Sequence, residues 1–538
     1  MALLDINRIA SSIGIGKKHL FQYGPNKAKV DLSIMDELKD RPDGKLVLVT
    51  AITPTKAGEG KTTASIALAE GMGKIKQKAL LCLREPSMGP VFGLKGGATG
   101  GGLATIEPSD DINLHFNGDM HALTSSINLI AAVIDNSIYQ GNPMGIDPDR
   151  IVWKRALDMN DRALRDIIVA RNDKKAIPHE ASFVITVASE MMAIMCLAID
   201  EQDFLRRLER IVVAFDKGGK PLTVKDFKVT HAVMRLMKQA LNPNLVQTRE
   251  HNPALVHGGP FANIAHGCNS LLATKMALKL SPIVITEAGF GADLGAEKFL
   301  DIASVEGGLN PSMAVVVATI RALKMHGGQP FEELKNPDIE ALKKGVCNLD
   351  KHMENMAKYG LPTLVAINHF ASDSEQEVAW LTKHCESMGY RHCFLDGFIK
   401  GGEGAVEFAT MVCDILSNTQ SHYHPLYSRT MPVKEKIERI AKEIYGAKGV
   451  RYSTLAESKL NLIHDLGLDD AYVCMAKTPN SLSDNAKLLG VPTDFEIDVR
   501  DIDFAAGANF VIPLCGSILT MPGLPKVPAA AKMEEEPW

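Results

Sequence analysis

The chain has 538 residues, of which 46% are hydrophobic and 23% are charged, and its formal net charge is -5. This composition is typical of a globular protein, and the length exceeds the roughly 250–300 residues that one core organises, so we expect two to four domains. A mildly acidic chain offers no electrostatic surface for nucleic acid or an anionic membrane, and we expect neither as a partner.

Nine cysteines are scattered along the chain without a CxxC pair. This odd count and spacing indicate neither a disulfide framework nor a zinc site, and favour free thiols in a reducing compartment. The segment 1–5 lacks a basic region followed by an apolar run, and the apolar stretch 182–199 is interrupted by Glu190. We therefore expect a cytoplasmic protein without a membrane span.

Short, β-branched apolar runs recur along the chain and alternate with glycine-containing loops and helix-forming segments. The first run, 45–52, precedes a loop and a helix expected over 62–74. Runs of the same kind follow at 78–83, 183–188, 210–214, 283–286, 314–318 and 362–367. Such runs are typical of strands buried on both faces of a parallel sheet. The alternation predicts the α/β class, with a mainly parallel sheet flanked by helices.

The sharpest motif lies between the first apolar run and the helix that follows it. It reads Thr55-Lys56-Ala57-Gly58-Glu59-Gly60-Lys61-Thr62. The glycines allow a tight turn with inward N–H groups, and the helix N-terminus and Lys61 add positive charge, as in a P-loop that binds nucleotide phosphates. Thr62 could place its hydroxyl on Mg²⁺. The full consensus has glycine where Thr55 stands, so a helix start with a tight turn is the alternative.

Several polar residues follow the second apolar run. Arg84 is expected at the carboxyl end of a strand, where it could grip a carboxylate or phosphate, or pair with an acid. The segment 93–102 holds six glycines around Lys95, and forms either a flexible loop or a close approach to an anion. Asp119 and His121 are candidates for a cation ligand and a proton shuttle, although a lone histidine is more often structural.

Three phenylalanines fall on three loops that follow expected strands. Phe290 lies within 287–293, Phe370 follows the run 362–367, and Phe398 opens a glycine turn. Three aromatic rings on neighbouring loops could sandwich a flat heterocycle, although each could equally be a core side chain near the surface.

Together these residues resemble the formate–tetrahydrofolate ligase family, also called formyltetrahydrofolate synthetases. The segments 93–103 and 317–328 are close to two signatures of that family, and the longer segments 256–269 and 521–529 are similar to it as well. The resemblance extends from about residue 20 to about residue 530. A match of this length is far more specific than a three-residue motif.

The resemblance implies ATP-dependent ligation of formate to tetrahydrofolate, which gives 10-formyltetrahydrofolate, ADP and phosphate through formyl phosphate. It also implies Mg²⁺, activation by a monovalent cation (K⁺ or NH₄⁺) and a homotetramer. By carry-over, Arg84 would hold the formyl phosphate. The residues implicated are Lys61, Arg84, Glu85 and Asp119 for catalysis and Phe290, Phe370 and Phe398 for folate.

The expected domains are a nucleotide-binding P-loop domain over 1–350 and two smaller α/β domains. The second, 351–425, would contribute loops to the folate site, and the third, 426–538, would be the C-terminal domain.

The sequence departs from the family at positions that flank the expected cleft. Lys56 replaces a usual proline, and Phe398 stands where members often have tryptophan. Thr99 and Leu103 replace a usual alanine and tyrosine. These differences motivate one alternative, a diverged paralogue that binds nucleotide or folate with weak or altered ligase activity. A different P-loop ligase or ATPase that uses another carboxylate is a third possibility.

Overall fold

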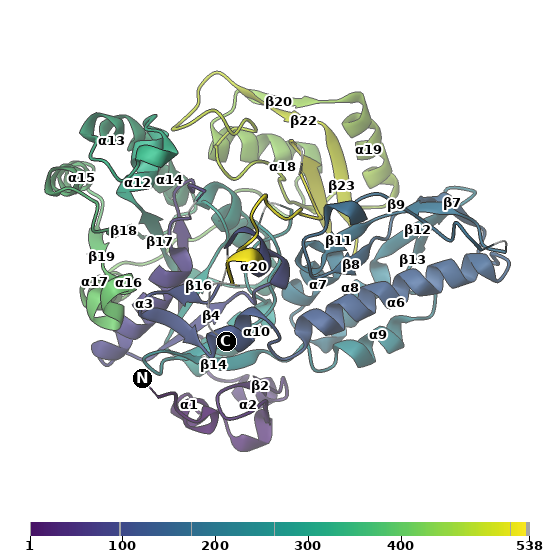
Figure 1. Ribbon diagram of the computed structural model, residues 1–538, viewed down its shortest axis with the longest axis horizontal. Helices are drawn as coiled ribbons and strands as arrows, with labels where there is room; N and C mark the ends of the chain where they lie inside the picture. Colours follow the sequence, from purple (N-terminus) through teal and green to yellow (C-terminus); the bar gives the residue numbers. More distant parts are fainter. Residues whose placement is uncertain are drawn as a thin grey trace.

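The structure is a computed structural model that describes residues 2–56, 58–95, 98–173, 175–262, 264–516 and 518–533, except for the side chains of Leu94 and Lys95. Among these residues, one sheet of twelve strands forms the centre of the molecule (Figure 1). Its order is β1 (Leu20–Gln22), β2 (Ala28–Val30), β14 (Asn244–Thr248), β15 (Pro253–Val256), β4 (Ala79–Leu83), β16 (Ile283–Glu287), β3 (Lys45–Ala51), β17 (Pro311–Ala318), β18 (Thr363–Asn368) and β19 (His392–Leu395). The strands β5 (Gly100–Gly101) and β6 (Ala104–Glu107) join this sheet through β14.

The seven strands that run in sheet order from β15 to β19 are parallel to one another, whereas β14 is antiparallel to both β15 and β2, and β2 is antiparallel to β1. Within β3, Leu46 and Leu48 belong to one hydrophobic core, and Val47 and Val49 belong to another. Successive side chains of a strand point to opposite faces, so the continuous apolar run fills two cores at once.

Helices cover both faces of this sheet. Side chains of α3 (Lys61–Lys74) and α17 (Val406–Asn418) enter the same core as Val47. Those of α10 (Leu271–Leu280), α12 (Ile320–His326) and α14 (Cys347–Lys358) enter the core on the other face. Four further helices lie around the sheet: α1 (Ile6–Ser12), α2 (Ile34–Leu38), α13 (Ile339–Gly345) and α15 (Glu375–Ser387).

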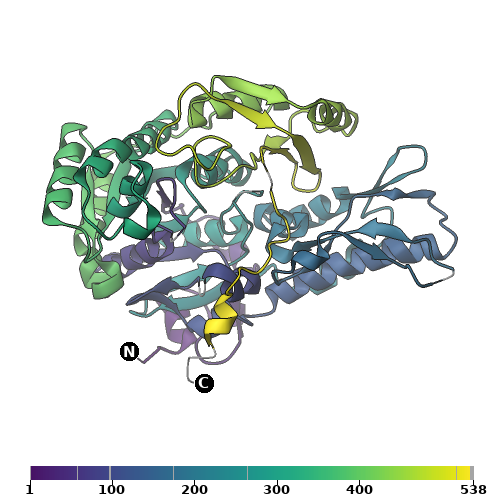
Figure 2. The same cartoon turned by 45° about the horizontal axis from the view of Figure 1, so that its top comes forward.

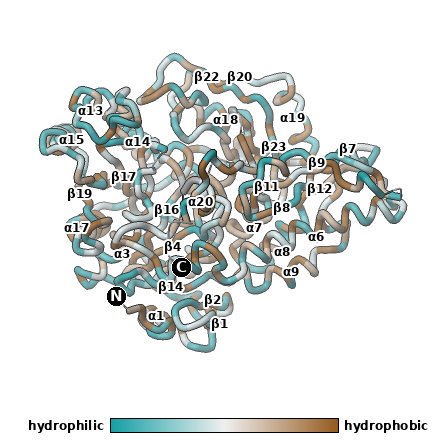
Figure 3. The backbone as a smooth tube through the Cα atoms, in the orientation of Figure 1, coloured by the Kyte–Doolittle hydropathy of each residue, from teal (hydrophilic) through white to brown (hydrophobic). Residues whose placement is uncertain are grey.

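An arm built around the long helix α6 (Asp119–Tyr139) extends to the right in Figures 1 and 2. Its helices are α7 (Glu190–Leu197), α8 (Glu201–Arg210) and α9 (Thr230–Met237). Its strands are β7 (Ile146–Ile151), β8 (Arg155–Leu157), β9 (Ile167–Val169), β10 (His179–Ala181), β11 (Phe183–Ile185), β12 (Val212–Asp216) and β13 (Pro221–Thr223). Brown and teal alternate along α6 in Figure 3, and apolar residues at helical spacing, such as Ile127, Ile130 and Ile134, are buried.

The C-terminal region packs above the sheet and the arm in Figure 1. Its elements are α18 (Val433–Ile440), β20 (Gly449–Tyr452), α19 (Thr454–Asp465), β21 (Tyr472–Val473), β22 (Glu496–Val499), β23 (Asp501–Ala505) and β24 (Phe510–Leu514). A fully buried ion pair of 2.7 Å between Lys477 and Asp293 joins this region to the segment after β16. The chain then returns to the sheet side (Figure 2) and ends with α20 (Ala529–Lys532) against the turn Val91–Lys95.

The predicted α/β class with a mainly parallel, helix-flanked sheet is confirmed. The runs 183–188 and 210–214, however, lie outside the central sheet, as β11 and β12 in small sheets of the arm. β11 ends at Ile185 because a 3-10 turn follows at once, over Thr186–Ala188. Position 350 falls inside α14, and β18 and β19 extend the same sheet as β3, so the division into three domains stays a prediction.

Within the described ranges, no helix has both the length and the apolar character needed to cross a membrane.

Candidate functional site

The loops that follow the parallel strands emerge at one edge of the sheet, which we call the carboxyl edge. In doubly wound sheets, ligands bind in the crevice outside this edge. In sheet order, the segments that follow the strands there are Arg84 after β4, Ala288–Phe290 after β16, residues 52–60 after β3, Thr319 after β17, His369–Phe370 after β18 and Asp396–Phe398 after β19.

The expected phosphate loop forms a tight turn that leads into α3. Gly58 and Gly60 have φ of 78° and 73°, the left-handed region that glycine adopts without strain. The Gly58 N–H donates to the Thr55 carbonyl at 3.1 Å. Lys56 is exposed, Lys61 is partly buried in the first turn of α3, and Ala57 lies outside the described residues. The loop therefore turns tightly and leads into α3, and its binding of nucleotide phosphates stays a prediction.

Glu59 stabilises this loop through hydrogen bonds. Its side chain is buried, and its carboxylate accepts from the Thr55 N–H at 2.7 Å and from the Thr319 hydroxyl. The Asn368 amide donates to the Glu59 carbonyl at 3.2 Å, and a Cβ on Gly60 would lie 2.5 Å from the same amide nitrogen. Glu59 therefore joins the loop to the end of β17 through its carboxylate and to the end of β18 through its backbone carbonyl.

Thr53 fixes the start of the same loop. Its N–H donates to the Asn348 side chain at 3.1 Å, and its hydroxyl lies 3.0 Å from His352 Nε2. Its carbonyl lies 2.9 Å from His326 Nε2. Burial lowers the pKa of His352 to about 4 and also lowers that of His326, so both rings are neutral hydrogen-bonding groups at neutral pH.

The Thr62 hydroxyl donates to Glu287 Oε2 at 2.9 Å and lies 3.2 Å from Oε1. Glu287 is buried at the last position of β16. A hydroxyl and a carboxylate at the start of a phosphate-loop helix are oxygen donors of the kind that Mg²⁺ prefers. These residues fit a magnesium ion, and Glu287 is a candidate ligand in addition to Thr62.

Arg84 lies directly after β4, as predicted. Its Nη1 donates to the Pro260 carbonyl at 3.4 Å, and its buried Nε has no hydrogen-bond partner among the described residues. A Cβ on Gly289 would lie 3.0 Å from Nη1, so the loop after β16 passes against the guanidinium. The same loop touches the segment after β3, because a Cβ on Gly291 would lie 3.3 Å from the Ile52 carbonyl. The loop after β16 therefore lies against both Arg84 and the segment after β3 that leads into the phosphate loop.

Glu85, the residue after Arg84, and Asp119 are both buried. Asp119 makes an ion pair of 2.6 Å with Lys29 and accepts from Asn244 Nδ2 at 2.8 Å. Burial and the charge of Asp119 raise the pKa of Glu85 well above its usual range. Asp119 thus already has a cationic partner within the protein, which the sequence did not reveal because Lys29 lies 90 residues away on β2.

The three predicted aromatic residues lie on loops of the carboxyl edge. Phe290 has a φ of 57°, which is unusual for a bulky residue and costs about 1–3 kcal/mol. Arg321 lies 3.9 Å from the centre of the Phe370 ring. Phe398 is 55% exposed on α16 (Gly397–Lys400), and a Cβ on Gly101 would lie 3.0 Å from its ring.

Two further residues that the sequence singled out are His121 and Lys95. His121 is exposed in the first turn of α6, with its Nε2 3.5 Å from the Ser125 hydroxyl. The side chain of Lys95 lies outside the part of the chain that the structure describes.

Sequence reasoning missed the residues that hold the site together. Thr319, Asn368 and Arg321 contact the phosphate loop or an aromatic loop from neighbouring strand ends. Two of them, Thr319 and Arg321, lie within the segment 317–328, which the sequence analysis identified only as a family signature.

Comparison with protein families identifies the family of this chain. A family model described as formate–tetrahydrofolate ligase matches residues 1–537. The chain therefore belongs to the formate–tetrahydrofolate ligase family, a family of ATP-dependent ligases.

Proposed function

We propose that the carboxyl edge catalyses the ligation of formate to tetrahydrofolate in two steps through formyl phosphate. The observation that carries this proposal is the end of β16 and the loop that follows it. Glu287, the last residue of β16, binds Thr62 of the phosphate-loop helix, and Gly289 in the loop lies against the Arg84 guanidinium. A phosphate site and a guanidinium on either side of one loop can hold the two ends of a mixed anhydride.

In the first step, an oxygen of formate attacks the γ-phosphorus of ATP, and the bond to the β-phosphate oxygen breaks. The products are formyl phosphate and ADP. Phosphoryl transfer depends on positioning and charge neutralisation more than on covalent help. Lys61 and the N–H groups of the loop would neutralise charge on the phosphates. Mg²⁺, held through Thr62 and Glu287, would supply further positive charge when bound.

In the second step, the N10 lone pair of tetrahydrofolate attacks the formyl carbon. The carbon–oxygen bond to phosphate breaks, inorganic phosphate leaves, and N10 loses its proton. Arg84 would hold the phosphate through both steps, because its Nε is unpartnered among the described residues. Glu85 and Asp119 would act behind it as positioning residues, since Asp119 is already paired with Lys29.

Phe290, Phe370 and Phe398 would provide the faces on which the pterin stacks. Phe398 is the most accessible of them, and its loop lies beside that of Phe370 because β18 and β19 are neighbours. Stacking on exposed rings would place N10 outside the carboxyl edge.

The family membership also leads us to propose a cytoplasmic homotetramer that a monovalent cation, K⁺ or NH₄⁺, activates. Sedimentation analysis and activity in K⁺, NH₄⁺ and Na⁺ salts test these two points.

The central test is an assay of the pure protein with formate, MgATP and tetrahydrofolate, in which 10-formyltetrahydrofolate and ADP are both quantified. We expect equal amounts of the two products, and a loss of about 100-fold or more for Arg84→Ala without loss of thermal stability. Tight folate binding without turnover would instead identify a diverged paralogue. ADP release with acetate but not formate would identify a ligase for another carboxylate.

A further inference from the structure

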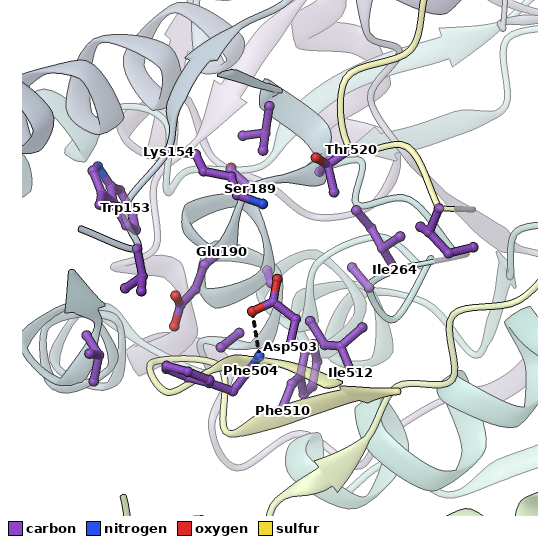
Figure 4. Close-up of a pocket in the computed structure, with 18 of the residues that line it drawn as sticks. Trp153, Lys154, Ser189, Glu190, Ile264, Asp503, Phe504, Phe510, Ile512 and Thr520 are labelled. Atoms are coloured by element: carbon purple, nitrogen blue, oxygen red, sulfur yellow. Dashed lines mark hydrogen bonds between the residues drawn. The ribbon is translucent and has the colours of Figure 1, made fainter. Parts of the chain in front are cut away.

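A cavity of about 220 Å³ lies between the arm and the C-terminal region, lined in part by residues 152–154 and α7 of the arm and by β23 and β24 (Figure 4). None of the residues proposed for catalysis, nucleotide or folate lines it. Its size exceeds that of a cavity of about 150 Å³, which holds one benzene molecule. It therefore has room for one ring or branched chain with a few polar atoms attached.

Most of the wall is apolar. Trp153 enters from the arm, Phe504, Phe510 and Ile512 enter from the C-terminal strands, and Ile264 enters from the central region (Figure 4). Phe510 is buried and packs edge-on against the His266 ring, with 5.9 Å between ring centres. Trp153 is held by a hydrogen bond of 3.0 Å from its indole N–H to the Ile127 carbonyl. These anchored rings form a fixed surface for an apolar group.

Two carboxylates also line the cavity. Glu190 Oε1 accepts the Gly507 N–H at 2.6 Å, and Asp503 Oδ1 accepts the Phe504 N–H at 2.9 Å. Both side chains are only partly buried, so each keeps acceptor capacity on the cavity side. Burial raises the pKa of Glu190 to about 8, and the charge of Asp503 adds to the rise, whereas backbone hydrogen bonds and Arg210 oppose it. A positive group between the two acids would relieve this repulsion.

Lys154 supplies the opposite charge. It lines the same cavity, is partly buried and makes no hydrogen bond or ion pair with any residue that the structure describes. In Figure 4 it enters from the side of Ser189 and Thr520, whereas Asp503 enters from the side of Phe504. The cavity therefore combines apolar walls with one lysine and two carboxyl groups that reach it from different elements.

We propose that this cavity binds a small zwitterion with an apolar body, of the chemical class of amino acids with hydrophobic side chains. The ligand carboxylate would pair with Lys154, its ammonium group with Glu190 and Asp503, and its side chain would lie against Trp153 and Phe510. Such a ligand matches every charged group that lines the cavity, whereas a simple amine or a simple acid leaves one sign of charge unmatched. The site is independent of the proposed ligase chemistry.

The test uses the full-length protein and four probes, L-phenylalanine, L-leucine, phenethylamine and 3-phenylpropionate, with titration followed by calorimetry and by intrinsic tryptophan fluorescence. We expect at least one amino acid to bind about tenfold or more tightly than phenethylamine, which lacks the carboxylate, and than 3-phenylpropionate, which lacks the ammonium group. If neither amino acid binds at millimolar concentration, or if the truncated probes bind equally well, the proposal is wrong.

Matched variants locate the two charge contacts. Lys154→Met should remove the advantage of the amino acid over phenethylamine, and Lys154→Arg should retain it. Glu190→Gln combined with Asp503→Asn should remove the advantage over 3-phenylpropionate. Lys217→Met makes the same change at an exposed position of the arm and should leave binding unchanged. The proposal is wrong if the cavity variants have the circular dichroism of wild type and still bind the amino acid with the same advantage over the truncated probes. It is also wrong if Lys217→Met reduces that advantage as much as the cavity variants do.

Discussion

The Thr62 hydroxyl donates a hydrogen bond of 2.9 Å to the Glu287 carboxylate and so joins the first turn of α3 to the end of β16. The two residues are far apart in sequence but meet because β16 and β3 are parallel neighbours in the sheet. In a phosphate-loop protein, this is the position at which a hydroxyl and an acid share the coordination sphere of Mg²⁺.

Glu287→Gln should therefore raise the magnesium concentration needed for half-maximal activity by about 10- to 100-fold. Glutamine keeps the size and one acceptor of the side chain but loses the negative charge that a divalent cation requires. The measurement is ligase activity against Mg²⁺ concentration at fixed ATP. Thr319→Val is the control, because Thr319 braces the loop through Glu59 without facing the proposed metal. An unchanged magnesium requirement in Glu287→Gln would remove this residue from the metal site.

Phe398 should determine folate affinity. The ring is 55% exposed and rests beside Gly101, and its carbonyl accepts the Leu103 N–H at 2.9 Å, so its backbone is fixed while one side of the ring stays available. Stacking of a base on an aromatic ring contributes about 1–3 kcal/mol, so Phe398→Ala should raise the KM for tetrahydrofolate by about 5- to 100-fold.

Steady-state kinetics with each substrate varied in turn separates this effect from general damage. The KM values for ATP and formate should change little in Phe398→Ala, and Phe398→Trp should keep or lower the KM for folate because it enlarges the stacking face. An equal rise in all three KM values would show that the ring supports the fold rather than the pterin.

The sequence predicted those parts of the fold and site that depend on neighbouring residues. The run 45–52, the turn at Gly58 and Gly60 and the start of α3 follow from local pattern and glycine geometry. The contact of Glu59 with Thr319 and that of Lys29 with Asp119 connect distant segments, so no local pattern could reveal them. β11 and β12 are as apolar as the central strands, and only their tertiary partners place them in the arm.

The Lys29–Asp119 pair allows a structural role for Asp119 to be separated from a catalytic one. Both side chains are at most 1% exposed, and removal of one partner of such a buried pair costs about 3–5 kcal/mol. Lys29→Met should therefore lower the denaturation midpoint strongly, because it leaves Asp119 charged beside Glu85. The double variant Lys29→Met/Asp119→Leu should recover much of this loss, since no unpaired charge remains.

Activity per folded molecule provides the second measurement for this pair. If Asp119 acts only through Glu85 and Arg84, the double variant should keep a measurable part of wild-type kcat. Its pH profile should shift, because the loss of Asp119 lowers the pKa of Glu85 more than the loss of the Lys29 charge raises it. Complete loss of turnover in a well-folded double variant would instead show that Asp119 contacts the reacting groups.

Glu70 should make the stability of the protein depend on pH. Its side chain is buried in α3, and its Oε1 lies 3.3 Å from the Glu250 backbone nitrogen. Burial raises the pKa of Glu70 from 4.5 to about 7, and the charge of Glu250 adds to the rise. Between these two pH values the folded protein binds the proton that the unfolded chain has released, so stability falls as pH rises through this window.

The full size of this effect is about 3 kcal/mol, because one pKa unit corresponds to about 1.36 kcal/mol. Glu70→Gln removes the titration, so its melting temperature relative to wild type should be higher at pH 8.5 than at pH 5.5. The measurement is thermal unfolding of both proteins at the two pH values. Glu250→Gln is the control. It should make the change of stability with pH smaller without abolishing it, because Glu70 stays buried. Equal differences in melting temperature at the two pH values would mean that Glu70 ionises in the folded protein as easily as in water.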